Sequence, residues 1–260
     1  MKILFIGDIV GSPGRRMVEK HLPRLIDEYK IDFVIANGEN SAGGAGISRK
    51  VFNELTAMGI DVFTMGNHIW DNKDIFNFID NEKRIVRPAN FNPTLPGAGY
   101  QIFDIAGQKL VVVNLVGRSF MPPAESPFMA MDKILAETRN ITPFVFVDFH
   151  AEATSEKNAL AWYLDGQVSA VIGTHTHIQT NDARILPRGT ILVTDAGMTG
   201  PRDSILGVEW EIIVKHFITQ MPARFNVAKG DIQFNGVIIE LCEDGRAKTI
   251  ELINFWEPGL

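Results

Sequence analysis

The sequence has a single cysteine, Cys242, among its 260 residues. No intramolecular disulfide can therefore form, and no pair of thiolates is available to bind zinc. Cys242 follows the mainly apolar residues 238–241, and this context predicts a buried thiol that packs as a small hydrophobic side chain. A metal site in this chain would have to use oxygen and imidazole ligands instead.

Long apolar runs and a basic surface are also missing. No stretch reaches the length of a membrane-spanning helix, and the first apolar run, residues 3–6, is too short for the core of a secretory signal. We therefore expect a cytoplasmic protein without a membrane partner. The 25 basic residues are outnumbered by 31 acidic ones, for a formal charge of −6. This balance argues against stable binding of duplex nucleic acid, which usually requires a basic face.

The sequence does contain an alternation of strand and helix patterns. Strand patterns such as residues 2–7 and 32–36 alternate with segments of helical apolar spacing, which predicts a mainly parallel sheet with flanking helices. Residues 100–115 and 232–255 each predict an antiparallel hairpin, because a short turn segment separates two strand patterns. No linker or repeat divides the chain, so we expect one domain over residues 1–260.

Polar side chains follow five runs of mainly apolar or β-branched residues. The runs are residues 3–6, 33–36, 62–65, 144–147 and 169–172. The polar residues after them are, in order, Asp8, Glu39 with Asn40, Asn67, His150, and His175 with His177. Buried strands deliver such side chains to the carboxyl edge of a sheet, so we expect them to lie together. Their donors suit hard or borderline divalent metals, and we expect two ions.

Each of these residues has a simpler explanation when it is considered alone. A lone histidine at a strand end more often forms a hydrogen bond than binds a metal. Asp8 and Asn67 both suit turns, and Glu39 could be solvated. However, four of the chain's six histidines lie at these strand ends. That conjunction favours a metal site over the separate explanations.

The order of the motifs resembles a known enzyme family. Gly-Asp at 7–8, Gly-Glu-Asn at 38–40, Gly-Asn-His at 66–68 and Gly-Thr-His-Thr-His at 173–177 are similar to the motifs of the calcineurin-like metallophosphoesterases. The Gly-Glu-Asn and Gly-Asn-His-Ile-Trp-Asp variants resemble the bacterial YmdB-type branch, whose members are phosphodiesterases of cyclic nucleotides. The resemblance implies an α/β fold, a four-layer α/β/β/α sandwich of two mixed sheets flanked by helices.

Two positions depart from the general superfamily pattern. The superfamily begins with Asp-x-His, but Val10 stands where this histidine would be, and valine cannot bind a metal. Glu39 replaces the usual bridging aspartate, and Asn40 follows it. The YmdB-type resemblance accounts for both changes, with the asparagine taking the place of the missing ligand. Together they argue against an ordinary phosphatase.

The resemblance implies two metal ions that share the Glu39 carboxylate. The first ion would be held by Asp8, Glu39, Asn40 and His177. The second would be held by Glu39, Asn67, His150 and His175. Mixed oxygen and imidazole ligands suit iron and manganese, and zinc is also compatible. Two carboxylates do not neutralise two divalent cations, so positive charge remains for a hydroxide and a phosphodiester anion.

This arrangement predicts a mechanism without a protein nucleophile. We expect a hydroxide that bridges the metals to attack phosphorus, because metal ions bring the pKa of a bound water near neutrality. His68 follows Asn67 but is not needed as a ligand, so we predict that it protonates or orients the leaving oxygen, as the resemblance also implies. Asp71 is the candidate to orient His68, although we favour for it a role as the N-cap of a helix at residues 72–78.

We predict a dinuclear metal-dependent phosphodiesterase that acts on small cyclic nucleotides, 2′,3′-cyclic and also 3′,5′-cyclic AMP and GMP. Two alternatives remain open. One is a phosphomonoesterase or nuclease on the same metal core, and the other is a nucleotide-binding regulatory protein with incidental turnover. A homo-oligomer is also open.

The sequence identifies no substrate-binding residue. Arg87 and Asn90 could be structural or could border the site, and Asp148 could support His150. The proline-containing residues 118–127 could form a base-stacking wall, but we favour an ordinary packed loop.

Overall fold

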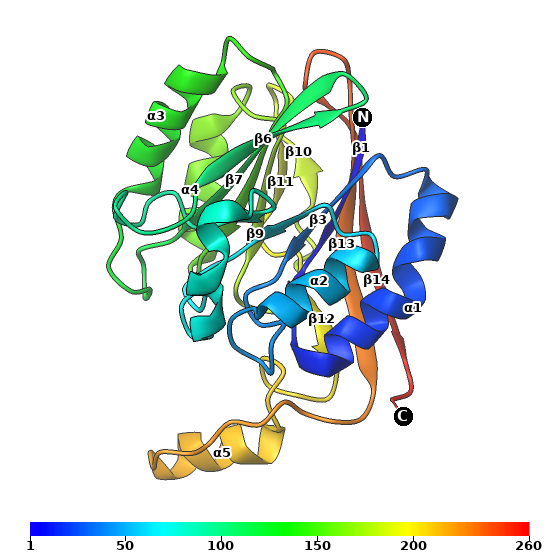
Figure 1. Ribbon diagram of the computed structural model, residues 1–260, viewed down its shortest axis with the longest axis vertical. Coiled ribbons are helices and arrows are strands. Elements are labelled where there is room, and N and C mark those ends of the chain that lie inside the picture. Colours follow the sequence, from blue (N-terminus) through cyan, green and yellow to red (C-terminus); the bar gives the residue numbers. More distant parts are fainter. Residues whose placement is uncertain (260) are drawn as a thin grey trace.

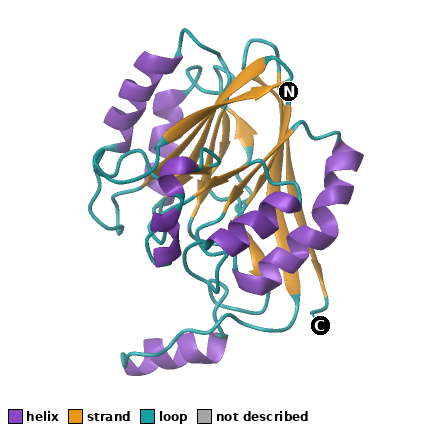
Figure 2. Cartoon of the chain, in the orientation of Figure 1, coloured by secondary structure: helices purple, strands orange, loops and turns teal. Residues whose placement is uncertain are grey.

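Two mixed β-sheets lie face to face in the computed structural model, which describes residues 1–259 (Figures 1 and 2). The strands of the larger sheet are β1 (Lys2–Ile6), β2 (Asp8–Ile9), β3 (Phe33–Asn37), β4 (Val62–Thr64), β5 (Ile85–Val86), β12 (Met198–Pro201), β13 (Ile232–Leu241) and β14 (Ala247–Glu257). Their order is β2-β12-β13-β1-β3-β4-β5, with β14 paired to β13. The neighbours from β1 to β5 run parallel, whereas β13 runs antiparallel to β1.

The smaller sheet is also parallel at its centre. Its strands are β6 (Tyr100–Ile105), β7 (Gln108–Val116), β8 (Val145–His150), β9 (Ala170–Thr174), β10 (Arg184–Ile185) and β11 (Ile191–Val193). Their order is β10-β11-β9-β8-β7-β6. β7, β8, β9 and β11 run parallel, and the two edge strands are antiparallel to their neighbours.

Helices cover the outer faces of both sheets. The α-helices are α1 (Gly11–Tyr29), α2 (Arg49–Ala57), α3 (Pro127–Thr138), α4 (Thr154–Leu164) and α5 (Trp210–Thr219), and the short 3₁₀ helices are η1 (Lys73–Asn77) and η2 (Ile79–Asn81). α1 and α2 pack on the larger sheet, and α3 and α4 pack on the smaller one. α5 projects away from the sandwich (Figure 1). None of the helices in residues 1–259 is long and apolar enough to span a membrane.

The period of two along each strand divides the core into layers. Ile3 and Phe5 of β1 belong to the core between the sheets, whereas Leu4 belongs to the core beneath α1 and α2. Between the sheets the Phe5 and Phe146 rings pack with their centroids 5.1 Å apart. Burial of each such side chain contributes roughly 1.5–3 kcal/mol. The predicted four-layer sandwich is therefore confirmed, as are both hairpins, β6–β7 and β13–β14.

The prediction that Cys242 is buried is wrong. Cys242 is exposed, because β13 ends one residue earlier, at Leu241. The backbone N–H of Cys242 donates to the carbonyl of Arg246 at 2.8 Å. The cysteine therefore opens the turn of the hairpin, outside the apolar layer that the preceding residues enter.

The loop between β7 and α3 also differs from the prediction in part. Phe120 is 93% exposed and has a positive φ of 60°, so it does not pack as an ordinary loop residue would. Phe128 does pack, edge-on against Tyr163 with ring centroids 5.3 Å apart. The loop is anchored at its α3 end and projects Phe120 into solvent.

Candidate metal centre

The polar residues that end the parallel strands meet at one edge of the sandwich. β1, β3 and β4 of the larger sheet and β8 and β9 of the smaller sheet bring their carboxyl ends to this edge. His150 is the last residue of β8 rather than part of the following loop. The residues that the strands carry there are Asp8, Glu39, Asn40, Asn67, His68, His150, His175 and His177.

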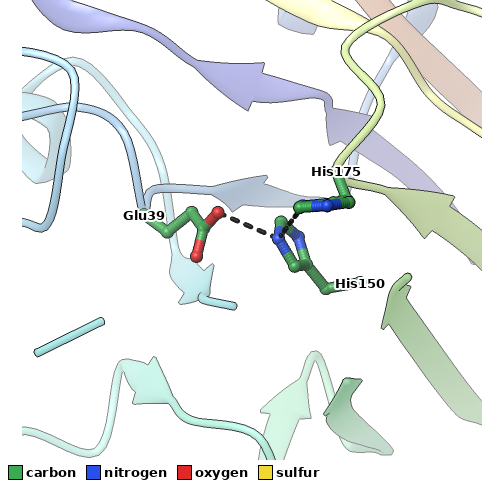
Figure 3. A group of neighbouring side chains, drawn as sticks. All are labelled: Glu39, His150 and His175. Atoms are coloured by element: carbon green, nitrogen blue, oxygen red, sulfur yellow. Dashed lines mark hydrogen bonds and ion pairs between the residues drawn. The ribbon is translucent and has the colours of Figure 1, made fainter. Parts of the chain in front are cut away.

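One group of side chains surrounds the imidazole of His150 (Figure 3). Its Nε2 atom lies 2.9 Å from Glu39 Oε1, 3.1 Å from Asn67 Oδ1 and 3.0 Å from His175 Nδ1. Ligand atoms of Glu39, His150 and His175 all lie within 4.8 Å of one another. This spacing is the one required for several protein atoms to bind a single metal ion, and the group matches the second predicted ligand set.

The remaining predicted ligands are buried polar atoms without partners. Asp8 Oδ1, Asn40 Oδ1 and His177 Nδ1 have no hydrogen-bond partner, although each atom is buried. The other Asp8 oxygen accepts from the backbone N–H of His175, and the Asn40 amide donates to the carbonyl of Gly44. An unsatisfied buried polar atom is costly, and a bound cation would satisfy these two oxygens and this nitrogen. The first predicted ligand set therefore also fits a metal ion.

The two carboxylate oxygens of Glu39 have different partners, His68 and His150. Its Oε2 atom accepts from the backbone N–H of His68 at 2.8 Å, while Oε1 faces His150. Gly66 makes this approach feasible, because a Cβ atom there would lie 2.5 Å from His150 Nε2 and closer still to Glu39 Oε2. The close approach of Glu39 and His150 thus depends on a glycine that supplies no metal ligand.

The charges around the site favour cations. Asp8, Glu39, Asp148 and Asp195 are buried at this edge, whereas Lys157 is the one fully buried ammonium beside them in the described part of the chain. Burial raises the pKa of Asp8 well above its usual value, and the neighbouring carboxylates add to this effect against the opposing charge of His150. A metal ion would stabilise the ionised form of these acids.

Two of the three histidine rings in the predicted ligand sets, His175 and His177, are neutral, and the third, His150, is charged. Burial lowers the pKa of His175 to about 3 and that of His177 to about 4, so both rings are neutral at pH 7 and have a free lone pair. Burial opposes the charged form of His150, but Glu39 outweighs it and raises that pKa to about 9. In return, His150 outweighs the burial of Glu39 and lowers the pKa of Glu39 to about 2. Neutral imidazole and ionised carboxylate are the forms that bind metals, so His175, His177 and Glu39 already have the required form, whereas His150 would release its proton when a cation binds.

Asp148 orients His150 through an intervening threonine. The Thr174 hydroxyl donates to Asp148 Oδ1 at 2.7 Å, so its oxygen is available to accept from His150 Nδ1 at 2.9 Å. Asn37 donates to the other Asp148 oxygen at 3.0 Å. This chain leaves His150 Nε2 directed toward Glu39 and holds the ring in one orientation. The sequence indicated Asp148 as a candidate support but not Thr174, although Thr174 lies inside the Gly-Thr-His-Thr-His motif.

Sequence reasoning missed three further residues at this edge. Glu152 Oε2 lies 3.2 Å from His175 Nε2, which leaves Nδ1 of that ring toward the cluster. Asp195 accepts from the backbone N–H and the hydroxyl of Thr176, at 3.1 and 2.8 Å, and pairs with Lys157 at 2.8 Å. These contacts fix a strained turn, because His175 and His177 on either side of Thr176 have φ angles of 97° and 63°. No short motif in the sequence could reveal these long-range pairs.

We predict that Lys157→Met lowers the free energy of unfolding by about 3–5 kcal/mol, because it leaves Asp195 as a buried charge without its ion-pair partner. Urea denaturation followed by circular dichroism measures this loss. Lys133→Met, on the exposed face of α3, is the matched control. Equal stability of the two variants would contradict the structural role of the ion pair.

Asp71 contacts His68 rather than capping a helix. Its Oδ2 atom lies 2.8 Å from His68 Nδ1, whereas the side chain of Asn72 accepts from the backbone N–H of Asp74 and caps η1. The prediction that Asp71 is the N-cap is therefore wrong by one residue. The alternative, in which Asp71 orients His68, fits the geometry.

Comparison with known proteins places this site in context. Residues 4–253 match the family model described as YmdB-like protein. The chain is 52% identical over 252 residues to the 2′,3′-cyclic-nucleotide 2′-phosphodiesterase of Bacillus subtilis strain 168, and the match covers 97% of this chain and 95% of that protein. A crystal structure described as a novel phosphatase of Mycoplasma pneumoniae superposes with a TM-score of 0.94 at 34% identity, covering 99% of this chain and 94% of that one.

A more distant structural likeness concerns the fold alone. The 5′-nucleotidase precursor of Thermus thermophilus superposes with a TM-score of 0.61 at 12% identity, covering 99% of this chain and 54% of that one. The predicted four-layer sandwich is consistent with this likeness.

Proposed function

Because the chain belongs to the YmdB-like protein family, we propose that it is a metal-dependent phosphodiesterase that hydrolyses 2′,3′-cyclic nucleotides. The name of the Bacillus relative supplies the substrate class. The observation that carries the proposal is the gathering of Glu39, His150 and His175 ligand atoms within 4.8 Å. The unpartnered buried atoms of Asp8, Asn40 and His177 lie at the same edge of the sandwich. 3′,5′-Cyclic AMP and GMP are further substrates that we include in the proposal.

Two ions, iron or manganese, are proposed for this site. One would be held by Asp8, Glu39, Asn40 and His177, and the other by Glu39, Asn67, His150 and His175. When bound, such ions supply Lewis acidity and activate water at neutral pH. The protein contributes the orientation of these ligands, because Asn37, Thr174, Asp148 and Glu152 hold the side chains from behind.

His68 is the proposed proton donor to the leaving oxygen. Its ring is partly exposed at the rim of the site, and its Nδ1 atom faces Asp71. We propose that Nε2, the ring nitrogen left free by this contact, donates the proton that the leaving alkoxide needs. The backbone N–H of His68 donates to Glu39 Oε2 at 2.8 Å, so the turn that orients this carboxylate also positions the proposed proton donor.

His68→Ala should retain metal and lose rate chiefly on substrates with poor leaving groups. We expect a fall of about 10²- to 10⁴-fold in kcat for 2′,3′-cyclic AMP, whose leaving group is a ribose alkoxide, and a much smaller fall for bis-p-nitrophenyl phosphate. Metal content by plasma mass spectrometry and steady-state kinetics measure the two effects. His216→Ala, on α5, is the control. Equal losses on both substrates would rule out proton donation by His68.

Hydrolysis of 2′,3′-cyclic AMP and bis-p-nitrophenyl phosphate by manganese- or iron-loaded protein tests the proposed function. We expect turnover of both diesters and much slower turnover of p-nitrophenyl phosphate. The Mycoplasma relative is named a phosphatase, so faster turnover of the monoester would instead favour a phosphomonoesterase. Absence of turnover by fully loaded protein would favour a regulatory nucleotide-binding protein.

A further inference from the structure

A cavity of about 640 Å³ opens beside the proposed metal centre. Asn67, a proposed metal ligand, forms part of its wall, and Trp70 follows in the same turn. The remaining walls come from two loops, one around Phe91 and Leu95 and one that includes Pro122. The cavity therefore adjoins one of the proposed metal ligands, and its volume suits a small ligand.

The lining of this cavity suits a flat and uncharged group. Trp70, Phe91, Leu95 and the prolines of both loops provide apolar surface, and the polar side chains are mostly asparagine amides. Glu125 is the single charged residue that lines the cavity, and no lysine or arginine does. A cavity without cationic groups is unsuited to a second phosphate or to a polynucleotide backbone. Aromatic and apolar walls are the surfaces on which bases stack.

The two loops that form the cavity are held together by hydrogen bonds of a buried asparagine. Asn90 is 1% exposed, and its side-chain amide donates to the carbonyls of Val116 and Glu125 at 2.8 and 2.9 Å. Its Oδ1 atom accepts from the backbone N–H of Val116 at 2.9 Å. All three of these hydrogen bonds of the Asn90 side chain fix the cavity wall. Asn90 is therefore a structural residue that also borders the site.

Two other contacts hold the apolar walls in place. The buried Arg87 guanidinium donates to the carbonyls of Leu95 and Pro96, at 3.3 and 3.0 Å, and so supports the first loop from below. The Trp70 ring stacks on Phe76 with a centroid separation of 5.2 Å and an interplanar angle of 10°. The walls are therefore preformed, which lowers the entropic cost of binding.

We propose that this cavity binds the nucleobase of the substrate, with Trp70 and Phe91 as its main contact surfaces. The inference rests on the proposed function. A single ribose joins the base of a cyclic nucleotide to its phosphodiester, so a phosphate held at Asn67 places the base in the adjoining space. The side chain between the two subsites is Asn67 itself, which faces His150 and lines the cavity.

The experiment compares two substrates that differ only in the base. The first is 2′,3′-cyclic AMP, and the second is the 2′,3′-cyclic phosphate of 1-O-methylribose, in which a methoxy group replaces adenine. Trp70→Leu should raise KM for cyclic AMP about 5- to 100-fold more than KM for the methyl riboside. Trp162→Leu, which removes a half-exposed indole from α4 outside the cavity, should leave the ratio of the two KM values unchanged.

Two outcomes of this comparison decide the proposal. A selective rise in KM for cyclic AMP supports it, and equal changes for both substrates overturn it. Trp70 also packs against the core, so Ala124→Trp, which would fill the cavity with an indole, provides a second variant with the same expected selectivity if Trp70→Leu fails to fold.

Failure of the proposed function would look different. If loaded wild-type protein hydrolyses neither substrate, equilibrium dialysis of 3′-AMP tests the base site without turnover. Weaker binding by Trp70→Leu but not by Trp162→Leu would then support the cavity proposal, and equal binding by both variants and wild type would overturn it.

Discussion

Glu39→Gln is expected to abolish turnover of cyclic nucleotides almost completely while the sandwich stays folded. The amide keeps the volume of the side chain and can still accept from the backbone N–H of His68. It removes the charge that faces His150 at 2.9 Å and that is proposed to join the two metal ions. Because metal chemistry supplies several kcal/mol of transition-state stabilisation, we expect kcat/KM to fall on the order of 10³-fold or more.

The measurement combines kinetics with metal content. Wild-type and Glu39→Gln proteins are loaded identically with manganese or iron, and bound metal is counted by plasma mass spectrometry. Glu152→Gln, which alters the half-exposed partner of His175, is the milder comparison and should retain most of the metal. Near-wild-type turnover of Glu39→Gln protein at saturating metal would refute a mechanism that needs two bridged ions.

Gly66→Ala should be nearly as damaging, although it removes no functional group. The added methyl group would lie 2.5 Å from His150 Nε2 and also overlap Glu39, so both side chains must move. We expect a destabilisation of about 1–3 kcal/mol from overpacking and a fall in kcat/KM on the order of 10²-fold or more from displaced ligands. Thermal unfolding and hydrolysis of 2′,3′-cyclic AMP measure the two effects.

Gly38→Ala is the matched control for this substitution. Gly38 precedes Glu39, and a methyl group there would approach most closely the Phe63 ring, at 3.1 Å. It should therefore affect stability slightly and leave the ligand cluster in place. If Gly66→Ala retains full metal content and activity, the cluster must be wider in solution than in the structure.

Much of the architecture follows from patterns within single strands. Ile3 and Phe5 alternate with Leu4 and Ile6 between the inner and outer cores, and that alternation can be read from adjacent residues. Asp8, Glu39 and His150 follow or end apolar runs, so their presence at one edge follows from the parallel direction of the strands that carry them. Their proposed roles as metal ligands remain predictions, as does that of His68 in proton transfer.

Local turn chemistry was predicted less well. Asp71 and Asn72 are both good capping residues, and the backbone geometry of η1 selected Asn72. Cys242 was predicted to be buried because most residues at the end of β13 are apolar, but the strand ends one residue before it. In both cases the side chain lies next to the boundary of a helix or strand, and a shift of one residue across this boundary changes its surroundings. The sequence pattern alone cannot place such a boundary to within one residue.

The sequence by itself determined the layers of the fold and the set of polar side chains that the strands bring to one edge of the sandwich, because strand periodicity and strand ends are local properties. Only the tertiary structure decided how those donors are oriented and what lies beside them. Lys157 pairs with Asp195, 38 residues away, and Asn90 joins a loop 35 residues away. Such contacts depend on how the sheets, helices and loops pack. The resulting energies come from burial and hydrogen bonds between distant segments, which no short motif records.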